Sequence, residues 1–115
     1  MTETDCLFCR IARREIPAEI THEDDQVLVF RDVRPQAPTH LLAIPVRHIG
    51  SAHQLTDQDA ELLGRLFAAL RRAADDEGLA NGYRIVTNVG PDAGQSVAHL
   101  HLHLLGGRHL GWPPG

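Results

Sequence analysis

The amino-acid sequence predicts an α+β fold, with an antiparallel sheet of about five strands, one long helix and one short helix. Two observations carry this prediction. Residues 57–76 form one long stretch with apolar residues at helical spacing, whereas the other apolar stretches are short and bounded by turn residues, as strands are. Strands and helices also do not alternate along the chain, as they would in a parallel α/β sheet. We expect the 115 residues to form a single domain, residues 1–115.

A short helix and a hairpin are expected first. Residues 6–14 end in basic side chains, which the helix dipole favours at a C-terminal end, and the helix must stop before Pro17. The apolar residues expected on one side of this helix are Leu7, Ile11 and Phe8. Residues 19–22 and 26–32 are rich in strand-forming residues and flank an acidic turn, which indicates an antiparallel hairpin.

A loop and a buried strand should follow. Prolines at both ends of the segment 35–38 prevent a strand there, so we expect a loop that delivers Thr39 and His40 to the next element. Residues 41–46 are apolar enough to be a buried strand. Pro45 indicates that this strand ends, or has a bulge, at that position.

The long helix has recognisable start and stop signals. Thr56 and Asp59 have the spacing of a capping box, and Gly78 is a plausible residue to follow the C-terminus. The apolar stripe expected to pack on the sheet is Leu62, Leu63, Leu66, Phe67, Leu70 and Ala73. A strand over residues 83–89 and a glycine-rich loop over residues 90–96 come next.

The last strand is expected over residues 99–105, where histidine alternates with leucine. Successive side chains of a strand point to opposite faces, so His99, His101 and His103 should share one face, with the leucines buried on the other. Same-face neighbours lie about 6.6 Å apart, too far for a direct hydrogen bond between them. Such a row needs a ligand, a metal or a third group, unless it is only the solvated face of an edge strand.

These histidines lie next to a loop that suits an anion. The glycines of residues 90–96 let backbone N–H groups approach a phosphate, and Ser96 adds a hydroxyl donor. A neutral imidazole can attack phosphorus, and the middle histidine, His101, has a partner on either side. A backbone carbonyl that accepts its Nδ1 proton would leave Nε2 free to act.

Metal binding is the competing use of the same residues. A catalytic zinc would require a nearby carboxylate, and residues 99–105 contain none. A structural zinc is easier to support, because Cys6 and Cys9 have the spacing of two zinc ligands. The alternatives for this pair are a redox dithiol or two small buried residues. No organic cofactor is expected.

Composition limits the other possibilities. The net charge of −4 argues against a nucleic-acid surface, and no apolar run approaches the length of a membrane span. The acidic start of the chain, residues 1–5, lacks the features of a signal peptide, so we expect a cytoplasmic protein.

Taken together, the motifs resemble those of the histidine-triad (HIT) superfamily, which has three histidines separated by single apolar residues, followed by two more apolar residues. Within it, the chain is most similar to the Hint branch of nucleotide-binding proteins, which are purine nucleoside phosphoramidases. The stretches that carry this resemblance are residues 14–18, 35–40, 94–96, 99–105, 105–108 and 112–115.

The resemblance implies a role for each matching residue. His101 would be the nucleophile at the α-phosphate of a purine nucleotide, His103 and His40 would lie around the phosphate, and Ser96 would hold its oxygens. The remaining nucleotide-binding residues would be Leu7, Phe8, Ile11, Phe30, Asp32, Val33, Asn88, Gly94 and Gln95. In this set Asp32 would bind the ribose hydroxyls, the backbone of Gly94 and Gln95 would bind phosphate oxygens, and the apolar side chains would surround the base. Phe8 and Phe30 fit core packing equally well.

The resemblance also implies a metal and a partner. A bacterial subset of the branch pairs the two cysteines with histidines at the positions of His48 and His99, which gives a structural zinc site. Hint-like proteins form homodimers, in which the C-terminal tail with Trp112 would reach the partner's site. The alternatives are a dinucleoside polyphosphate hydrolase, and a non-catalytic nucleotide sensor or protein-interaction scaffold.

Overall fold

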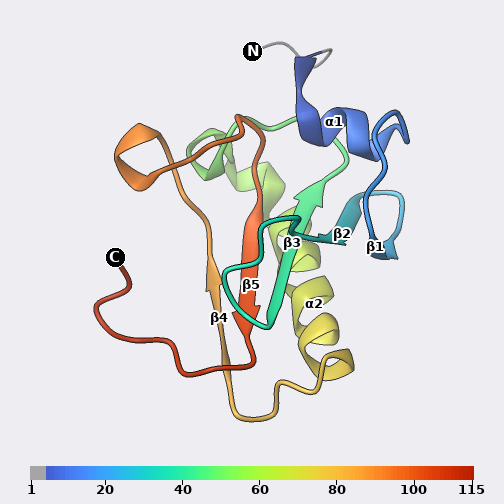
Figure 1. Cartoon of the computed structure of the whole chain (residues 1–115). Helices are drawn as coiled ribbons and strands as arrows, with labels where there is room; N and C mark the ends of the chain where they lie inside the picture. The colour runs from blue at the N-terminus through green and yellow to red at the C-terminus, as the bar shows by residue number, and fades with distance from the viewer. Residues whose placement is uncertain (1–4) are drawn as a thin grey trace.

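The computed structural model describes residues 5–115 and contains one antiparallel sheet in the strand order β1-β2-β3-β5-β4 (Figure 1). The strands are β1 (Ile20–Glu23), β2 (Val27–Arg31), β3 (Thr39–Pro45), β4 (Tyr83–Val86) and β5 (Leu102–Gly106). The helices are the short α1 (Leu7–Ala12) and the long α2 (Ala60–Asp76). The α+β class and the sheet of five strands are therefore confirmed. Residues 1–4, used above to argue against a signal peptide, lie outside the described residues.

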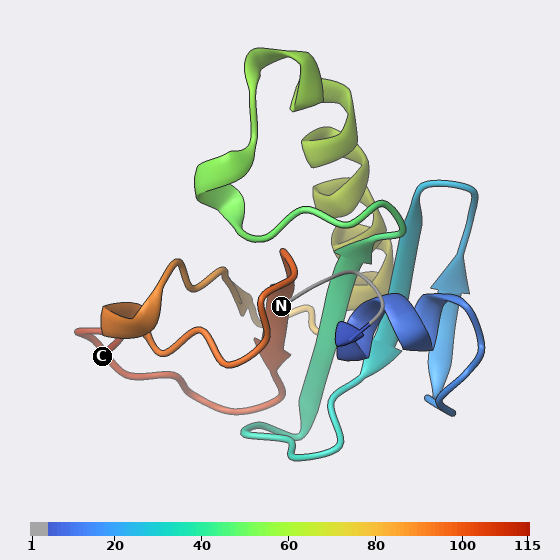
Figure 2. The ribbon, with the colours of Figure 1, turned by 90° about the horizontal axis from the view of Figure 1, so that it is seen from above.

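The two helices cover opposite faces of the sheet (Figures 1 and 2). Because strand side chains alternate, β3 sends Leu41 and Ala43 toward α2 and sends Leu42 and Ile44 toward α1. The strand is thus buried on both faces over its whole length. This gives the sheet a core on each side, and it places His40, two residues before Leu42, on the face of α1.

The long helix begins and ends close to the expected residues. Thr56 and Asp59 form the capping box, but they cap a 3₁₀ turn (Asp57–Asp59) that leads into α2. Gly78 follows the helix with a φ of 71°, a conformation that favours glycine. The apolar stripe is narrower than expected, because Phe67 is 45% exposed whereas Leu66 and Leu70 are fully buried.

The last strands differ most from the expectation. The strand expected over 83–89 ends at Val86, and the strand expected over 99–105 begins only at Leu102. Residues 99–101 leave the sheet, so the histidines do not form one continuous row. They are also not solvated, because His99 is 0% and His101 is 5% exposed. Since β5 pairs with both β3 and β4, the alternative of a solvated edge strand is wrong.

Helix α1 also differs from its expected orientation. Phe8, Cys9 and Ile11 are its buried residues, whereas Leu7 is 42% exposed. Cys6 precedes the helix as its N-cap, with its Sγ accepting the Cys9 amide hydrogen at 3.5 Å. Neither α1, α2 nor any other helical segment within residues 5–115 is long and apolar enough to cross a membrane.

Candidate active site

Three histidines meet on the face of the sheet covered by α1. In the pairing of β3 with β5, Leu42 lies opposite His103 and His40 lies opposite Leu105, which makes His40 and His103 diagonal neighbours. His40 Nε2 lies 2.9 Å from His103 Nδ1, and the rings of His101 and His103 are 5.1 Å apart. The third group that the histidine row required is therefore His40, from the neighbouring strand.

Two backbone groups determine where the imidazole protons lie. The Gln36 amide donates to His40 Nδ1 at 3.0 Å, so neutral His40 carries its proton on Nε2 and donates it to His103 Nδ1. His103 then carries its own proton on Nε2. At the other end, His101 Nδ1 donates to the His99 carbonyl at 2.6 Å, as expected, and Nε2 of His101 keeps its lone pair.

Burial keeps these rings neutral near pH 7. It lowers the pKa of His101, although the hydrogen bond to the His99 carbonyl and the charge of Asp32 act in the opposite direction. Burial likewise lowers the pKa of His40, although the charge of Asp32 acts to raise it. For His103, burial together with the neighbouring His101 and His40 lowers the pKa to about 4. A neutral imidazole is the form that can act as a nucleophile.

The histidines open into a cavity of about 430 Å³. One wall comes from α1 and the segment after it, another from β2 and the residues that follow it, and a third from the segment before β5. The lining residues are Leu7, Phe8, Ile11, Ile16, Pro17, Ala18, Phe30, Arg31, Asp32, Val33, Arg34, Leu42, Ser96, Val97, His101 and His103. The cavity is thus largely apolar, and its polar and charged residues are Arg31, Asp32, Arg34, Ser96, His101 and His103.

Most of the residues expected to bind a nucleotide line this cavity. Phe8 and Phe30 also pack edge to face at 5.5 Å within the core, so they serve both of the roles weighed for them. The cavity residues that the sequence analysis missed include Ile16, Pro17 and Ala18, although they lie in one of the stretches that carried the resemblance. His40 does not line the cavity and reaches it through His103.

The glycine-rich loop contributes less than expected. The Gly94 amide donates to the Pro91 carbonyl at 3.0 Å, and the Gln95 amide donates to the Gly90 carbonyl at 3.1 Å. These two expected phosphate donors are therefore already used within the loop, where they close its turn. Neither residue lines the cavity, nor does Asn88, whereas Ser96 does.

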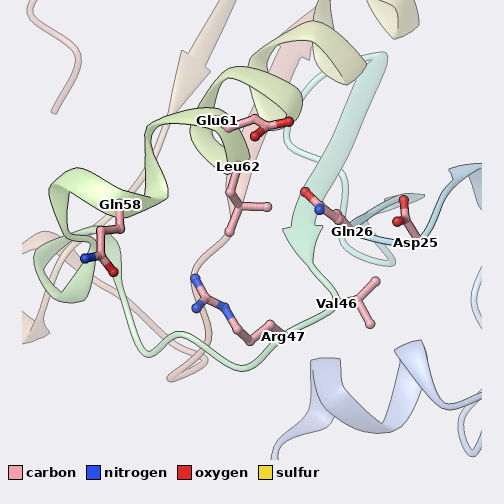
Figure 3. A pocket seen from close by; sticks show the side chains of 7 residues that line it. All are labelled: Asp25, Gln26, Val46, Arg47, Gln58, Glu61 and Leu62. Atoms are coloured by element: carbon pink, nitrogen blue, oxygen red, sulfur yellow. The ribbon is translucent and has the colours of Figure 1, made fainter.

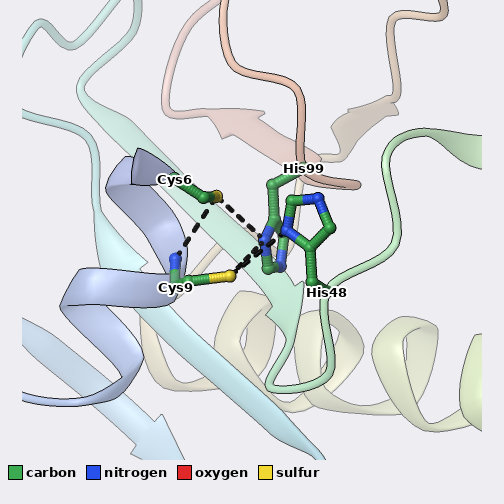
Figure 4. Close-up of side chains that lie close together, drawn as sticks. All are labelled: Cys6, Cys9, His48 and His99. Carbon is green, nitrogen blue, oxygen red and sulfur yellow. Dashed lines mark hydrogen bonds between the residues drawn. The ribbon is translucent and has the colours of Figure 1, made fainter. Parts of the chain in front are cut away.

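The remaining predicted residues form a second cluster behind the first. Cys6 and Cys9 from α1 meet His48 from the segment after β3 and His99 from the segment before β5 (Figure 4). Cys6 Sγ lies 3.3 Å from His99 Nδ1, and Cys9 Sγ lies 3.2 Å from His48 Nδ1 and 3.5 Å from His99 Nδ1. All four donor atoms lie within 4.8 Å of one another.

This donor set fits a tetrahedral zinc ion. Ligand atoms at the usual zinc bond lengths are about 3.6 Å from one another, close to the sulfur–nitrogen separations found here. His99 Nε2 also donates to the Pro45 carbonyl at 2.9 Å, which orients the ring with Nδ1 toward the thiols. The cysteines are almost completely buried and are not joined by a disulfide. The four residues could therefore hold a metal ion.

Asp32, His40 and His103 are the other group close enough to hold a metal. Their hydrogen bonds oppose it, because the Gln36 amide occupies the Nδ1 lone pair of His40 and leaves a proton on Nε2, the atom that would have to bind the metal. This cluster is arranged for hydrogen bonding instead. The competing interpretation of the triad as a metal site is thus disfavoured at these residues.

A second cavity, of about 490 Å³, lies near the start of α2 (Figure 3). None of the candidate site residues lines it. Arg47, which reaches into it, is paired with Asp59 at 2.5 Å, and the other charged lining residues are the carboxylates Asp25 and Glu61. Its chemistry gives no reason to place the active site there.

The fold and the site define a class of α+β proteins with histidines grouped at two adjacent central strands, β3 and β5. Comparison with known proteins narrows this class. A family model described as "Scavenger mRNA decapping enzyme C-term binding" matches residues 5–111. An uncharacterized HIT-like protein from Synechococcus elongatus is 54% identical over 111 residues, which cover 96% of this chain and 97% of the relative.

Solved structures agree with this match. A HIT family hydrolase from Legionella pneumophila superposes with a TM-score of 0.95 at 54% identity, over 96% of this chain and 100% of that one. A histidine triad protein from Clostridium difficile gives a TM-score of 0.91 at 38% identity, over 96% and 97% of the two chains. This chain belongs to the histidine-triad (HIT) family and is similar to its hydrolases.

Proposed function

We propose that this protein hydrolyses purine nucleoside phosphoramidates, breaking the P–N bond at the α-phosphate through a covalent nucleotidyl-histidine. One observation carries the proposal: His101 is buried, its Nδ1 donates to the His99 carbonyl, and it lines the apolar cavity. A neutral imidazole fixed in this tautomer has its Nε2 lone pair available to attack phosphorus.

The cavity suits a nucleotide of this kind. The apolar side chains of Phe8, Ile11 and Phe30 would contact the faces of the base, where they make no hydrogen bonds that distinguish one purine from another. Asp32 would accept the ribose hydroxyls, because a carboxylate can accept several hydrogen bonds: its Oδ1 accepts from the Arg34 amide, its Oδ2 lies 3.4 Å from His40 Nε2, and each oxygen has a further lone pair. The α-phosphate would then lie near Ser96 and His101.

The reaction would proceed in two displacements. In the first, Nε2 of His101 forms a bond to phosphorus, and the P–N bond of the substrate breaks as the nitrogen leaves as an amine with a proton from solvent. The Nδ1–H donated to the His99 carbonyl stabilises the positive charge that develops on the ring. In the second, water attacks the same phosphorus and gives a proton back to solvent, the bond to His101 breaks, and the nucleoside monophosphate leaves.

His103 and Ser96 would stabilise the phosphoryl oxygens. The hydrogen bond from His40 directs the remaining proton of His103 to Nε2, and His103 and Ser96 both line the cavity. Donors held in place before the reaction stabilise developing charge without reorganising. His40 would act through His103 rather than by touching the phosphate.

The metal, the assembly and the location complete the proposal. Zinc held by Cys6, Cys9, His48 and His99 would be structural and would tie α1 to the sheet.

Strand β4 lies at one edge of the sheet with Tyr83 42% exposed, so we place a homodimer interface along this edge. The protein would act in the cytoplasm, where thiols stay reduced, with no nucleic-acid or membrane partner.

Trapping of the intermediate tests the proposal. Wild-type protein, mixed briefly with an adenosine phosphoramidate and denatured, should carry one nucleotidyl group on His101, located by mass spectrometry of peptides. His101→Gly should lose both the adduct and turnover, while His53→Ala, a change at an exposed histidine outside the cavity, should keep both. An adduct on another residue would refute the assignment. Faster turnover of diadenosine polyphosphates than of phosphoramidates would favour the polyphosphate hydrolase alternative instead.

A further inference from the structure

Two residues that follow the histidines, Gly107 and Arg108, pack against the loop before His40. Gly107 has a φ of 91°, and a Cβ atom there would lie 2.8 Å from the Cβ of Pro38. Only glycine allows this approach without displacing the loop. Arg108 then extends its guanidinium across the loop, and its Nη2 donates to the Gln36 carbonyl at 2.9 Å.

Gln36 helps to determine which ring nitrogen of His40 carries the proton. Its backbone amide donates to His40 Nδ1 at 3.0 Å, and its side-chain amide donates to the Arg34 carbonyl at 3.0 Å. The bond from Arg108 to the Gln36 carbonyl therefore holds Gln36 from its other side. An unbroken series of contacts runs from Arg108 through Gln36 and His40 to His103.

We propose that Arg108 is a positioning residue that, by holding Gln36, keeps His40 and His103 in the tautomers that present the Nε2 proton of His103 to the substrate phosphate. The inference rests on the proposed function for the role of that proton. The tautomers themselves depend on these contacts and on the Asp32 carboxylate, whose Oδ2 lies 3.4 Å from His40 Nε2 and also favours a proton there.

The tautomer of His40 depends on the Gln36 amide, which occupies the Nδ1 lone pair. If that donor moves away, the Nδ1 lone pair of His40 loses its partner, and only the weaker contact of Nε2 with Asp32 at 3.4 Å still favours a proton on Nε2. His40 can then carry its proton on Nδ1, and Nε2 becomes an acceptor. The short contact between His40 and His103 then requires His103 to donate from Nδ1, which leaves a lone pair on His103 Nε2. A phosphoryl oxygen would face this lone pair instead of a donor. One displaced amide thus reverses the polarity of the group in the cavity.

The tail has another arginine that serves as a matched control. Arg84 of β4 donates from Nη2 to the Gly111 carbonyl at 2.8 Å, so it holds the same tail but does not contact Gln36. Each arginine donates to one backbone carbonyl of another segment and makes one contact within the tail, Arg108 with the His109 carbonyl at 2.9 Å and Arg84 with the Trp112 ring at 6.0 Å. Met has a similar length without a donor. Comparison of Arg108→Met with Arg84→Met therefore separates the contact with Gln36 from general anchoring of the tail.

The test is ¹⁵N NMR of the imidazole nitrogens in the full-length protein, because protonated and unprotonated ring nitrogens resonate in separate regions. Wild type should show His40 and His103 protonated on Nε2. Arg108→Met should shift both rings toward the Nδ1 form and lower kcat about tenfold, the rate equivalent of one hydrogen bond, with KM near the wild-type value. Arg84→Met should leave both tautomers unchanged, and Arg108→Lys, which keeps a donor, should restore the wild-type pattern in part.

Each other outcome is informative. Unchanged tautomers in Arg108→Met would overturn the proposal, whatever happens to activity. An equal shift in Arg84→Met would overturn it as well, because any loosening of the tail would then suffice. If the tautomers shift as expected but wild type does not hydrolyse phosphoramidates, the proposed function fails while the positioning role stands.

Discussion

Lowering the pH from about 7.5 to about 5 should destabilise the wild-type protein more than a His103→Asn variant, by about 2 kcal/mol in the free energy of unfolding. The reason is the pKa of His103. Burial, together with His101 and His40, lowers this pKa to about 4 in the folded protein. In the unfolded chain the same side chain has a pKa of about 6.5.

The sign and size follow from these two values. Above about pH 6.5 both states hold His103 neutral, so the folded state bears no penalty. Below that pH the unfolded chain binds a proton that the folded protein does not accept until about pH 4. Stability is therefore lost as the pH falls from about 6.5 toward 4, at about 1.4 kcal/mol for each unit. A fall to about pH 5 spans about 1.5 units of this window, which gives about 2 kcal/mol.

Urea unfolding of both proteins at both pH values measures this difference. Asn is the appropriate replacement, because its side-chain oxygen can occupy the place of Nδ1 and still accept from His40 Nε2. The carboxylates and the cysteine–histidine cluster are unchanged in the variant, so their pH dependence cancels in the comparison. Equal losses of stability in the two proteins would show that His103 titrates near its ordinary pKa and would refute the reasoning.

Two further predictions concern the metal and the tail. Cys6→Ser/Cys9→Ser should lose one zinc per chain in metal analysis and should lower the Tm by more than about 5 °C, because the ion ties α1 to the sheet, while turnover stays largely intact. Correct folding with complete loss of activity would instead indicate a catalytic metal. Deletion of residues 111–115 should change the preference among amine leaving groups more than the Tm, because Trp112, 83% exposed in the single chain, would contact the partner's site in a dimer. An unchanged substrate profile, or a monomer by light scattering at micromolar concentration, would contradict this prediction.

Much of the fold could be predicted because its signals are local. The capping box at Thr56 and the proline at the end of β3 act within a few residues, and both lie where expected. The start of β5 could not be predicted in this way. Alternation continues through His99 and His101, but those residues leave the sheet, where His99 approaches Cys6 and Cys9. A periodic pattern does not reveal such a competing tertiary contact.

In the site, too, contacts between residues far apart in the sequence were harder to predict than local ones. His48 and His99 were assigned to the metal cluster by resemblance, and the structure brings them to Cys6 and Cys9. The hydrogen bonds that set the tautomers were not foreseen, apart from the carbonyl that accepts from His101. Gln36 and Arg108 are 72 residues apart in the sequence, although the Arg108 side chain donates to the Gln36 carbonyl. Neither residue type carries a signal for such a role by itself.

The histidine pair and the apolar cavity wall lie in different parts of the fold, and this separation has an evolutionary consequence. His40 and His103 lie on β3 and β5, each of which is hydrogen-bonded to a strand on both sides, whereas α1 and the segment after it supply much of the apolar cavity wall. Apart from Phe8, whose ring packs edge to face against His101 at 5.0 Å, substitutions in that wall would alter which nucleoside is accepted without moving the histidines of the proposed reaction. Lineages built on this scaffold can therefore diversify their substrates while inheriting one reaction unchanged.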